Sequence, residues 1–167
     1  MERRVNGTRY ELLSGDLKRN YATLLDAVMT LAAFAAFVTH DASGAYRASA
    51  LEMLELIEDD RFGTPTHVKE WPGTRLIGSN TATLHTFRLS LDVQRMLRTR
   101  ARSILDWSNP ELPDDLHFLR EDGTLIFGSI AHENYAWVVL NGTELALWKA
   151  ANGPRLVRPR DRRLGHA

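Results

Sequence analysis

Two dipeptides of the hairpin-turn type, Asp122-Gly123 and Asn141-Gly142, constrain the fold of this chain more than any other feature. Both are typical of type I′ turns, which need positive φ at both central residues, and Asp or Asn followed by Gly tolerates this best. With a third turn at Glu133-Asn134, they predict a four-strand antiparallel meander over residues 115–148. The expected strands cover residues 116–120, 124–130, 135–140 and 143–148.

The chain before the meander predicts helices and strands in alternation. Helices are expected from Tyr21, over 46–60 and after Ser90, and strands near 67–71 and 83–89. Residues 33–40 could continue the first helix or form a buried strand, and their Phe, Val and Thr content favours the strand. Ser90 is the expected cap of an arginine-rich helix that Pro110 must end. Its apolar stripe, predicted to pack on the sheet, is Val93, Met96, Leu97, Ala101, Ile104 and Leu105.

These elements predict an α+β fold, a mainly antiparallel sheet with a C-terminal β-meander and two or three helices packed against it. We expect a single domain over residues 1–149 and a basic, mobile tail over 150–167, which is rich in arginine and poor in apolar residues. The longest uncharged apolar run, 27–38, is shorter than the roughly 17–25 residues that a membrane-spanning helix requires.

Composition excludes several classes of function. Lys plus Arg and Asp plus Glu each number 21, so no global field attracts the chain to nucleic acid or to an anionic membrane. Cysteine is absent, which excludes disulfides, thiolate metal sites and a cysteine nucleophile, and is compatible with the reducing cytoplasm. No motif for a nucleotide, a cofactor or a serine nucleophile is present. We therefore expect no cofactor.

Four ordered segments resemble the signature of a small, uncharacterised bacterial family, some of whose members carry a sporulation-protein label. The resemblance implies a bacterial, cytosolic protein and no particular activity. Asp114 stands where the family pattern has Glu, and Thr124-Leu125 stands where it has an aromatic residue. The segments are Glu70-Trp71-Pro72-Gly73-Thr74, Leu112-Pro113-Asp114-Asp115-Leu116, Phe118-Leu119-Arg120-Glu121-Asp122-Gly123 and Ser129-Ile130-Ala131-His132-Glu133.

Candidate catalytic chemistry is confined to His132, because a histidine beside a carboxylate can act as a general acid or base. Its neighbour Glu133 would point to the other face of a strand, so the carboxylate would have to come from Asp114 or Asp115. No pair of histidines has the spacing of a metal site on one element, and no metal is expected. The six histidines are His40, His67, His85, His117, His132 and His166.

Candidate binding residues are arginines and tryptophans. Arg95, Arg98 and Arg102 lie on the helix after Ser90, while the preceding helix is acidic, and such faces can pair with a partner. Trp71 and Trp107 each stand shortly before a proline and are either core residues or exposed anchors for a partner.

Three functions follow as hypotheses. The first is a non-enzymatic bacterial protein-binding module of the immunity, antitoxin or regulatory-inhibitor type, with a protein partner or a second copy of the chain in a homodimer. The second is a small hydrolase or acid–base enzyme that uses His132 with Asp114 or Asp115. The third is weak binding of nucleic acid through the arginine-rich helix, although nucleic acid is not the partner we expect.

Overall fold

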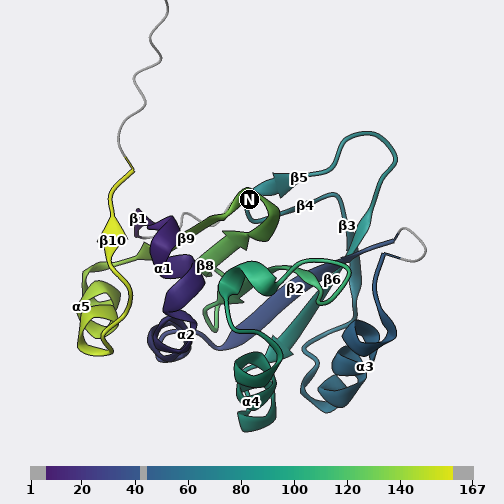
Figure 1. Ribbon diagram of the computed structural model, residues 1–167, viewed down its shortest axis with the longest axis horizontal. Coiled ribbons are helices and arrows are strands. Elements are labelled where there is room, and N and C mark those ends of the chain that lie inside the picture. The colour runs from purple at the N-terminus through teal and green to yellow at the C-terminus, as the bar shows by residue number, and fades with distance from the viewer. Residues whose placement is uncertain (1–6, 42–44, 160–167) are drawn as a thin grey trace, which may run out of the picture.

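The computed structural model describes residues 7–41 and 45–159 and confirms the α+β fold. Its main sheet has eight strands in the order β10-β1-β9-β8-β7-β2-β6-β3, and all neighbouring strands are antiparallel (Figure 1). The strands are β1 (Thr8–Leu12), β2 (Phe34–His40), β3 (Thr66–Val68), β6 (Ala82–Arg88), β7 (Asp114–Leu119), β8 (Leu125–Ile130), β9 (Tyr135–Leu140) and β10 (Leu156–Val157).

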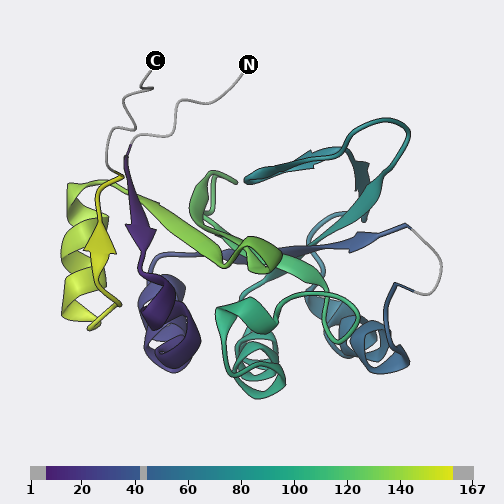
Figure 2. The same ribbon diagram turned by 45° about the horizontal axis from the view of Figure 1, so that its top comes forward.

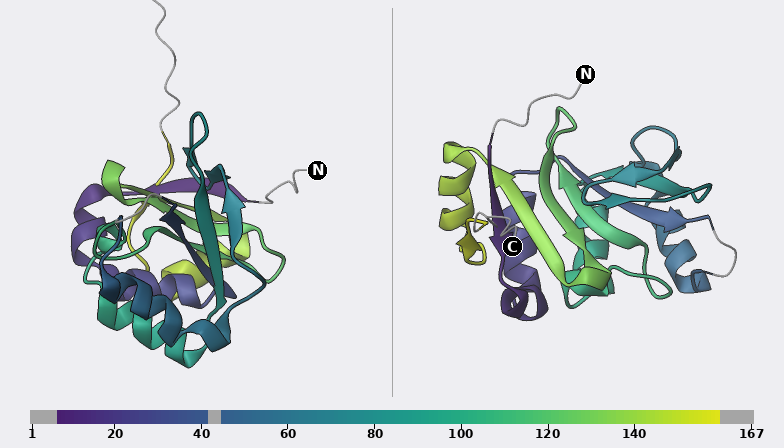
Figure 3. Two further views of the ribbon diagram at one scale, coloured as in Figure 1. Left: turned by 90° about the vertical axis from the view of Figure 1, so that its right-hand side faces the viewer. Right: turned by 90° about the horizontal axis from the view of Figure 1, so that it is seen from above.

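Helices cover one face of this sheet, and a small hairpin covers part of the other (Figure 2). The fifth helix lies beside the edge formed by β10 and β1, as the view from above shows (Figure 3). The helices are α1 (Ser14–Arg19), α2 (Tyr21–Met29), α3 (Ala48–Leu56), α4 (Leu91–Arg100) and α5 (Gly142–Ala150), and the hairpin pairs β4 (Glu70–Trp71) with β5 (Thr74–Arg75).

Side chains of β2 show how the two faces are built. Ala35 and Phe37 belong to the main core under the helices, whereas Val38 packs with Trp71 of the hairpin. Successive residues of a strand point to opposite faces. Because β2 is apolar on both faces, the predicted strand at 33–40 forms in the middle of the sheet, between β6 and β7.

The predicted meander is confirmed for three of its four strands, β7, β8 and β9. The turn at Asp122-Gly123 is at the expected position, but only Gly123 has positive φ, at 82°, and its amide donates to Arg120 O. This is a three-residue loop with a glycine in the left-handed region, not a type I′ turn. The turn at Glu133-Asn134 follows a short 3-10 helix, Ala131–Glu133, and ends at the left-handed Asn134.

The fourth predicted strand is wrong, because residues 143–148 belong to helix α5. Asn141 is its N-cap and forms a capping box with Glu144, a pattern that serves a helix start as well as Asn-Gly serves a turn. Arg120 donates to both Glu144 carboxylate oxygens, at 2.6 and 2.7 Å, and to Val139 O at 2.7 Å. This bidentate pair ties the start of α5 to the end of β7.

Helix α4 begins at the Ser90 cap as predicted, where the Ser90 hydroxyl accepts from the Val93 amide. It ends at Arg100, earlier than expected, because a second capping box joins Ser103 to Asp106 and starts a short 3-10 helix there. Most of the predicted stripe is nevertheless buried, namely Val93, Met96, Leu97, Ala101 and Ile104, with Leu105 partly buried against the same core.

The described part of the predicted tail differs from expectation, since the chain after α5 packs on the domain. Trp148 donates its indole N–H to Pro154 O at 3.0 Å, and Leu156–Val157 pairs with β1 as strand β10. Two apolar residues are enough to extend the sheet once a loop returns the chain to its edge. Residues 160–167 of the predicted tail lie outside the described residues.

Candidate functional site

Asp115, the second residue of strand β7, joins three separate segments of the chain. Its Oδ2 accepts from Trp71 Nε1 at 2.9 Å and from Thr74 Oγ1 at 3.5 Å, and its Oδ1 accepts from the Ala131 amide at 3.1 Å. Trp71 and Thr74 belong to the hairpin, and Ala131 follows β8. Segments 70–74, 112–116 and 129–133 therefore meet at one carboxylate.

The backbone and burial of Asp115 are both unusual. Its φ of 55° lies in the left-handed region, and the residue is 2% exposed. Burial raises the pKa of its carboxyl above the usual value, while the hydrogen bonds from Trp71 and Ala131 act in the opposite direction. Strained backbone and buried acids are enriched at functional sites, so the neighbouring groups decide what this one can do.

Asp114 holds a different part of the structure, the loop that precedes β7. Its Oδ2 accepts from the Tyr46 hydroxyl, and its Oδ1 accepts from the Asn109 amide at 3.2 Å. The Tyr46 hydroxyl also accepts from the His40 amide, and His40 Nε2 lies 3.9 Å from Asp114 Oδ2. Burial, followed by the bond to Asp114, raises the pKa of Tyr46, so its phenol remains a proton donor.

His132 forms no hydrogen bond or ion pair with either aspartate, although its charge acts on Asp115 at longer range and lowers the pKa of that carboxyl. Its side chain is 61% exposed, and among the described residues the carboxylate within ion-pair distance of its Nε2 is that of Glu133, at 3.8 Å. The 3-10 helix after Ile130 turns the imidazole outward, while Asp114 and Asp115 are buried. An acid–base pair of His132 with Asp114 or Asp115 is therefore not formed, and the aspartates have the geometry of structural anchors.

Both candidate tryptophans are core residues, so the exposed-anchor alternative is wrong. Trp71 is 5% exposed and Trp107 is fully buried. Trp107 stacks on Phe37 with ring centroids 5.4 Å apart, and its indole N–H donates to the Tyr21 hydroxyl at 2.9 Å. An indole at the end of an element can be covered from both sides, which proximity to a proline does not reveal.

The three candidate arginines differ in how they are paired. Arg98 forms an ion pair with Asp26 of α2 at 2.6 Å, and Arg95 forms an i,i+3 pair with Asp92 at 3.4 Å. The Arg102 guanidinium forms neither an ion pair nor a hydrogen bond with another described residue. Arg98 thus links two helices of this chain, and Arg102 is the arginine left available to a partner.

A pocket of about 460 Å³ lies where α4 ends, and Arg102 lines it together with Arg100. Arg100 likewise has no ion pair within the described part of the chain. In a continuous helix, residues two positions apart do not share a face, but the break at Ala101 brings both arginines to one pocket. The sequence pattern predicts a continuous helix and does not show this break, so Arg100 was not among the predicted binding residues. The other lining residues are Ser49, Thr99, Ala101, Asp106, Glu111 and Leu112.

The acidic groups of this pocket are already engaged. Asp106 Oδ2 accepts from the amides of Arg102 and Ser103, at 2.8 and 2.9 Å, and Glu111 pairs with Arg47 at 3.0 Å. Both carboxylates keep their negative charge, so a ligand at this pocket would meet the two guanidinium groups beside Asp106 and Glu111, neither of which pairs with Arg100 or Arg102. Charge-assisted hydrogen bonds from arginine favour a carboxylate or a phosphate.

Neither a metal-ligand cluster nor a membrane-spanning helix is found among the described residues. These residues contain no group of three or more His, Cys, Asp or Glu side chains arranged to hold a metal ion. Within the same ranges, no helix has the length and apolar character needed to cross a bilayer.

Two buried histidines give the protein a predictable response to acid. Burial lowers the pKa of His117 to about 4, and burial together with Arg61 lowers that of His85 to about 4, from 6.5. Between these values the unfolded chain binds more protons than the folded one, so stability present above pH 6.5 should be lost as the pH falls toward 4.

In the His117→Gln protein, the free energy of unfolding lost on acidification across that pH range should be smaller by up to about 3 kcal/mol. Urea unfolding followed at several pH values measures the slope, and His132→Gln, at an exposed position, is the matched control. An unchanged slope in a folded His117→Gln protein would contradict the assignment.

Comparisons of the chain with protein-family models, with curated proteins and with solved structures found no match.

Proposed function

We propose that this protein is a protein-binding module and that the pocket at the end of α4 receives an acidic segment of its partner. The observation that carries the proposal is the pair Arg100 and Arg102, which line one pocket and have no carboxylate partner among the described residues. An unpaired cation pair at a surface pocket favours a partner of opposite charge.

The surroundings of the pocket support the same partner chemistry. Arg95 lies on the preceding turns of α4 with its side chain 75% exposed, and its ion pair with Asp92 is equally exposed. Such surface pairs contribute little and exchange readily for other partners. Arg95 can therefore extend the basic surface from the pocket along α4, whereas Arg98 is held by Asp26.

The buried aspartates support a binding function more than a catalytic one. The carboxylates of Asp114 and Asp115 do not reach the surface. Both are buried, and their oxygens accept hydrogen bonds from the loops that they hold in place. General acid–base catalysis needs a proton-transfer group within hydrogen-bond reach of a substrate. A module of this kind needs only a rigid surface.

The proposal is tested with a fluorescein-labelled peptide rich in Glu and Leu, whose binding is followed by anisotropy at two ionic strengths. We expect saturable binding that weakens with salt and that the double variant Arg100→Glu/Arg102→Glu reduces at least about tenfold. The matched control, Arg155→Glu/Arg158→Glu, makes the same change in charge at the β10 edge and should retain the wild-type affinity.

Three outcomes would overturn the proposal. Equal loss of affinity in both double variants would mean that only net charge matters. Preferential binding of a single-stranded oligonucleotide to the same surface, with a steep salt dependence, would favour nucleic acid instead. Loss of a homodimer in the Arg100→Glu/Arg102→Glu protein, measured by sedimentation, would identify a second copy as the occupant.

A further inference from the structure

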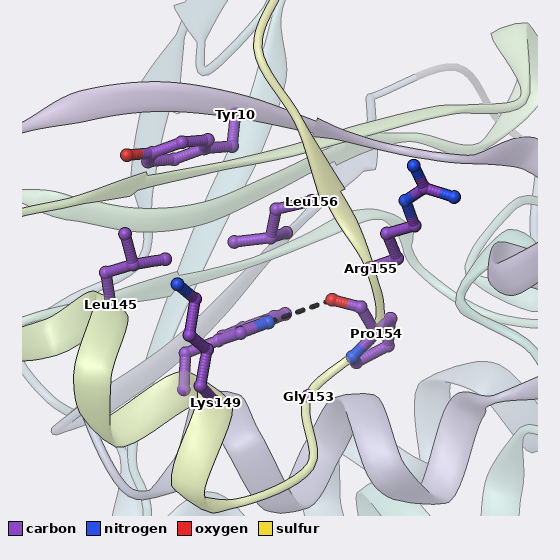
Figure 4. A pocket seen from close by; sticks show the side chains of 8 residues that line it. Tyr10, Leu145, Lys149, Gly153, Pro154, Arg155 and Leu156 are labelled. Atoms are coloured by element: carbon purple, nitrogen blue, oxygen red, sulfur yellow. Dashed lines mark hydrogen bonds between the residues drawn. The ribbon is translucent and has the colours of Figure 1, made fainter.

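A second pocket, of about 280 Å³, lies at the β10 edge of the sheet, between α5 and the chain that returns to β10. Figure 4 shows the side chains of Tyr10, Leu145, Lys149 and Leu156 around a common space, whereas the Arg155 guanidinium points away from it. The pocket is thus lined by apolar side chains and by one cation directed toward them. Its size is close to the lower limit of small-molecule sites, roughly 300 Å³.

The indole of Trp148 also lines this pocket, and two contacts fix its position. Its N–H donates to Pro154 O at 3.0 Å, so the indole needs no hydrogen bond from a ligand. A Cβ built at Gly153 would lie 2.4 Å from Trp148 Nε1, so glycine is required where the loop passes the ring. A pocket whose aromatic wall is held in this way is formed before a ligand arrives.

The polar groups of the pocket are available to a ligand. Neither the Lys149 ammonium nor the Tyr10 hydroxyl has an ion pair or a hydrogen bond with another described residue. An ammonium in such a position attracts an anion, and the Tyr10 hydroxyl is a further hydrogen-bond donor in the same pocket. The apolar remainder suits a ring, which can pack against the aromatic side chains.

We propose that this pocket binds a small aromatic carboxylate, with the carboxylate at Lys149 and the ring between Leu145, Leu156 and Trp148. The proposal is independent of the acidic-partner pocket, because it uses neither Arg100 nor Arg102.

Indole-3-acetate and benzoate are the probes, and neutral indole is the control ligand. In ¹H–¹⁵N correlation spectra we expect saturable shifts at Leu145, Leu156 and the Trp148 indole N–H, with a Kd of about 1 mM or below for one of the two acids. Neutral indole is expected to bind about tenfold more weakly, because it lacks the carboxylate.

Lys149→Met keeps the aliphatic stem and removes the charge. It should therefore weaken binding of the acid about tenfold and leave the affinity for neutral indole unchanged. Lys18→Met, at an exposed position of α1, is the matched control and should bind as the wild type does. The proposal is overturned if neither acid gives saturable shifts at these residues, or if Lys149→Met binds the acid as tightly as Lys18→Met. Each variant changes one exposed lysine. Resonances of residues away from the pocket show whether the variant is folded.

Discussion

Replacement of Asp115 by Ala is expected to lower the free energy of unfolding by about 3–5 kcal/mol. The Trp71 indole N–H and the Ala131 amide would both remain buried without their acceptor, and each such loss costs about 1–3 kcal/mol. Alanine would also have to adopt the left-handed backbone of this position, where φ is 55°, at a cost of about 1–2 kcal/mol.

Asp115→Asn is the matched control, because Asn keeps the shape, one carbonyl acceptor and the tolerance of left-handed backbone. It should lose roughly half as much stability as the alanine variant in urea unfolding. If Asp115 were instead a strained catalytic acid, the alanine variant would be as stable as the wild type or more so. A loss below about 1 kcal/mol would therefore contradict the structural role.

The second large effect is expected at Trp107, where replacement by Ala should cost about 3–5 kcal/mol. The indole is fully buried, stacks on Phe37 and donates to the Tyr21 hydroxyl, which in turn donates to Leu97 O at 2.8 Å. Its removal leaves a cavity under the helices and takes away the donor to a buried phenol.

Trp107→Phe separates the two contributions, since a phenyl ring still packs on Phe37 but cannot donate to Tyr21. We expect it to lose about 1–3 kcal/mol, less than the alanine variant. Thermal and urea unfolding measure both. If the alanine variant kept its stability but no longer bound its partner, Trp107 would be an interface residue and not a core residue.

Local chemistry made much of the fold predictable. Ser90 marks the start of α4, and the Asp122-Gly123 and Glu133-Asn134 turns separate β7, β8 and β9. In each case the signal and the structure it produces lie within a few residues of each other. A short-range rule can therefore be applied without knowledge of the rest of the molecule.

The errors have physical causes of two kinds. At Asn141-Gly142 the same residues serve a hairpin turn or a helix cap, and the partner that favours the helix, Arg120, lies 24 residues before Glu144. The two-residue strand β10 depends on pairing with β1, and β1 pairs with β9 on its other side. Both carry too few apolar residues to be recognised alone. Strand pairing is a tertiary property that short segments do not encode.

The candidate site was less predictable than the fold, because its geometry depends on contacts between distant segments. Trp71 and Asp115 are 44 residues apart in the sequence, and only the folded hairpin brings them together. Burial of Trp107 and the meeting of Arg100 with Arg102 at one pocket are likewise results of packing. Residue types suggested which groups could act, but not which of them would be free to do so.

The place of β1 between β9 and β10 bears on how the protein is made. Glu11 and Tyr135, which are joined by a hydrogen bond in the folded protein, are 124 residues apart. At a translation rate of about 5–20 residues per second, the ribosome needs roughly 6–25 s to cover that distance. Throughout this interval the emerging β1 has neither of its neighbours, and an unpaired strand is open to chaperones and to wrong partners.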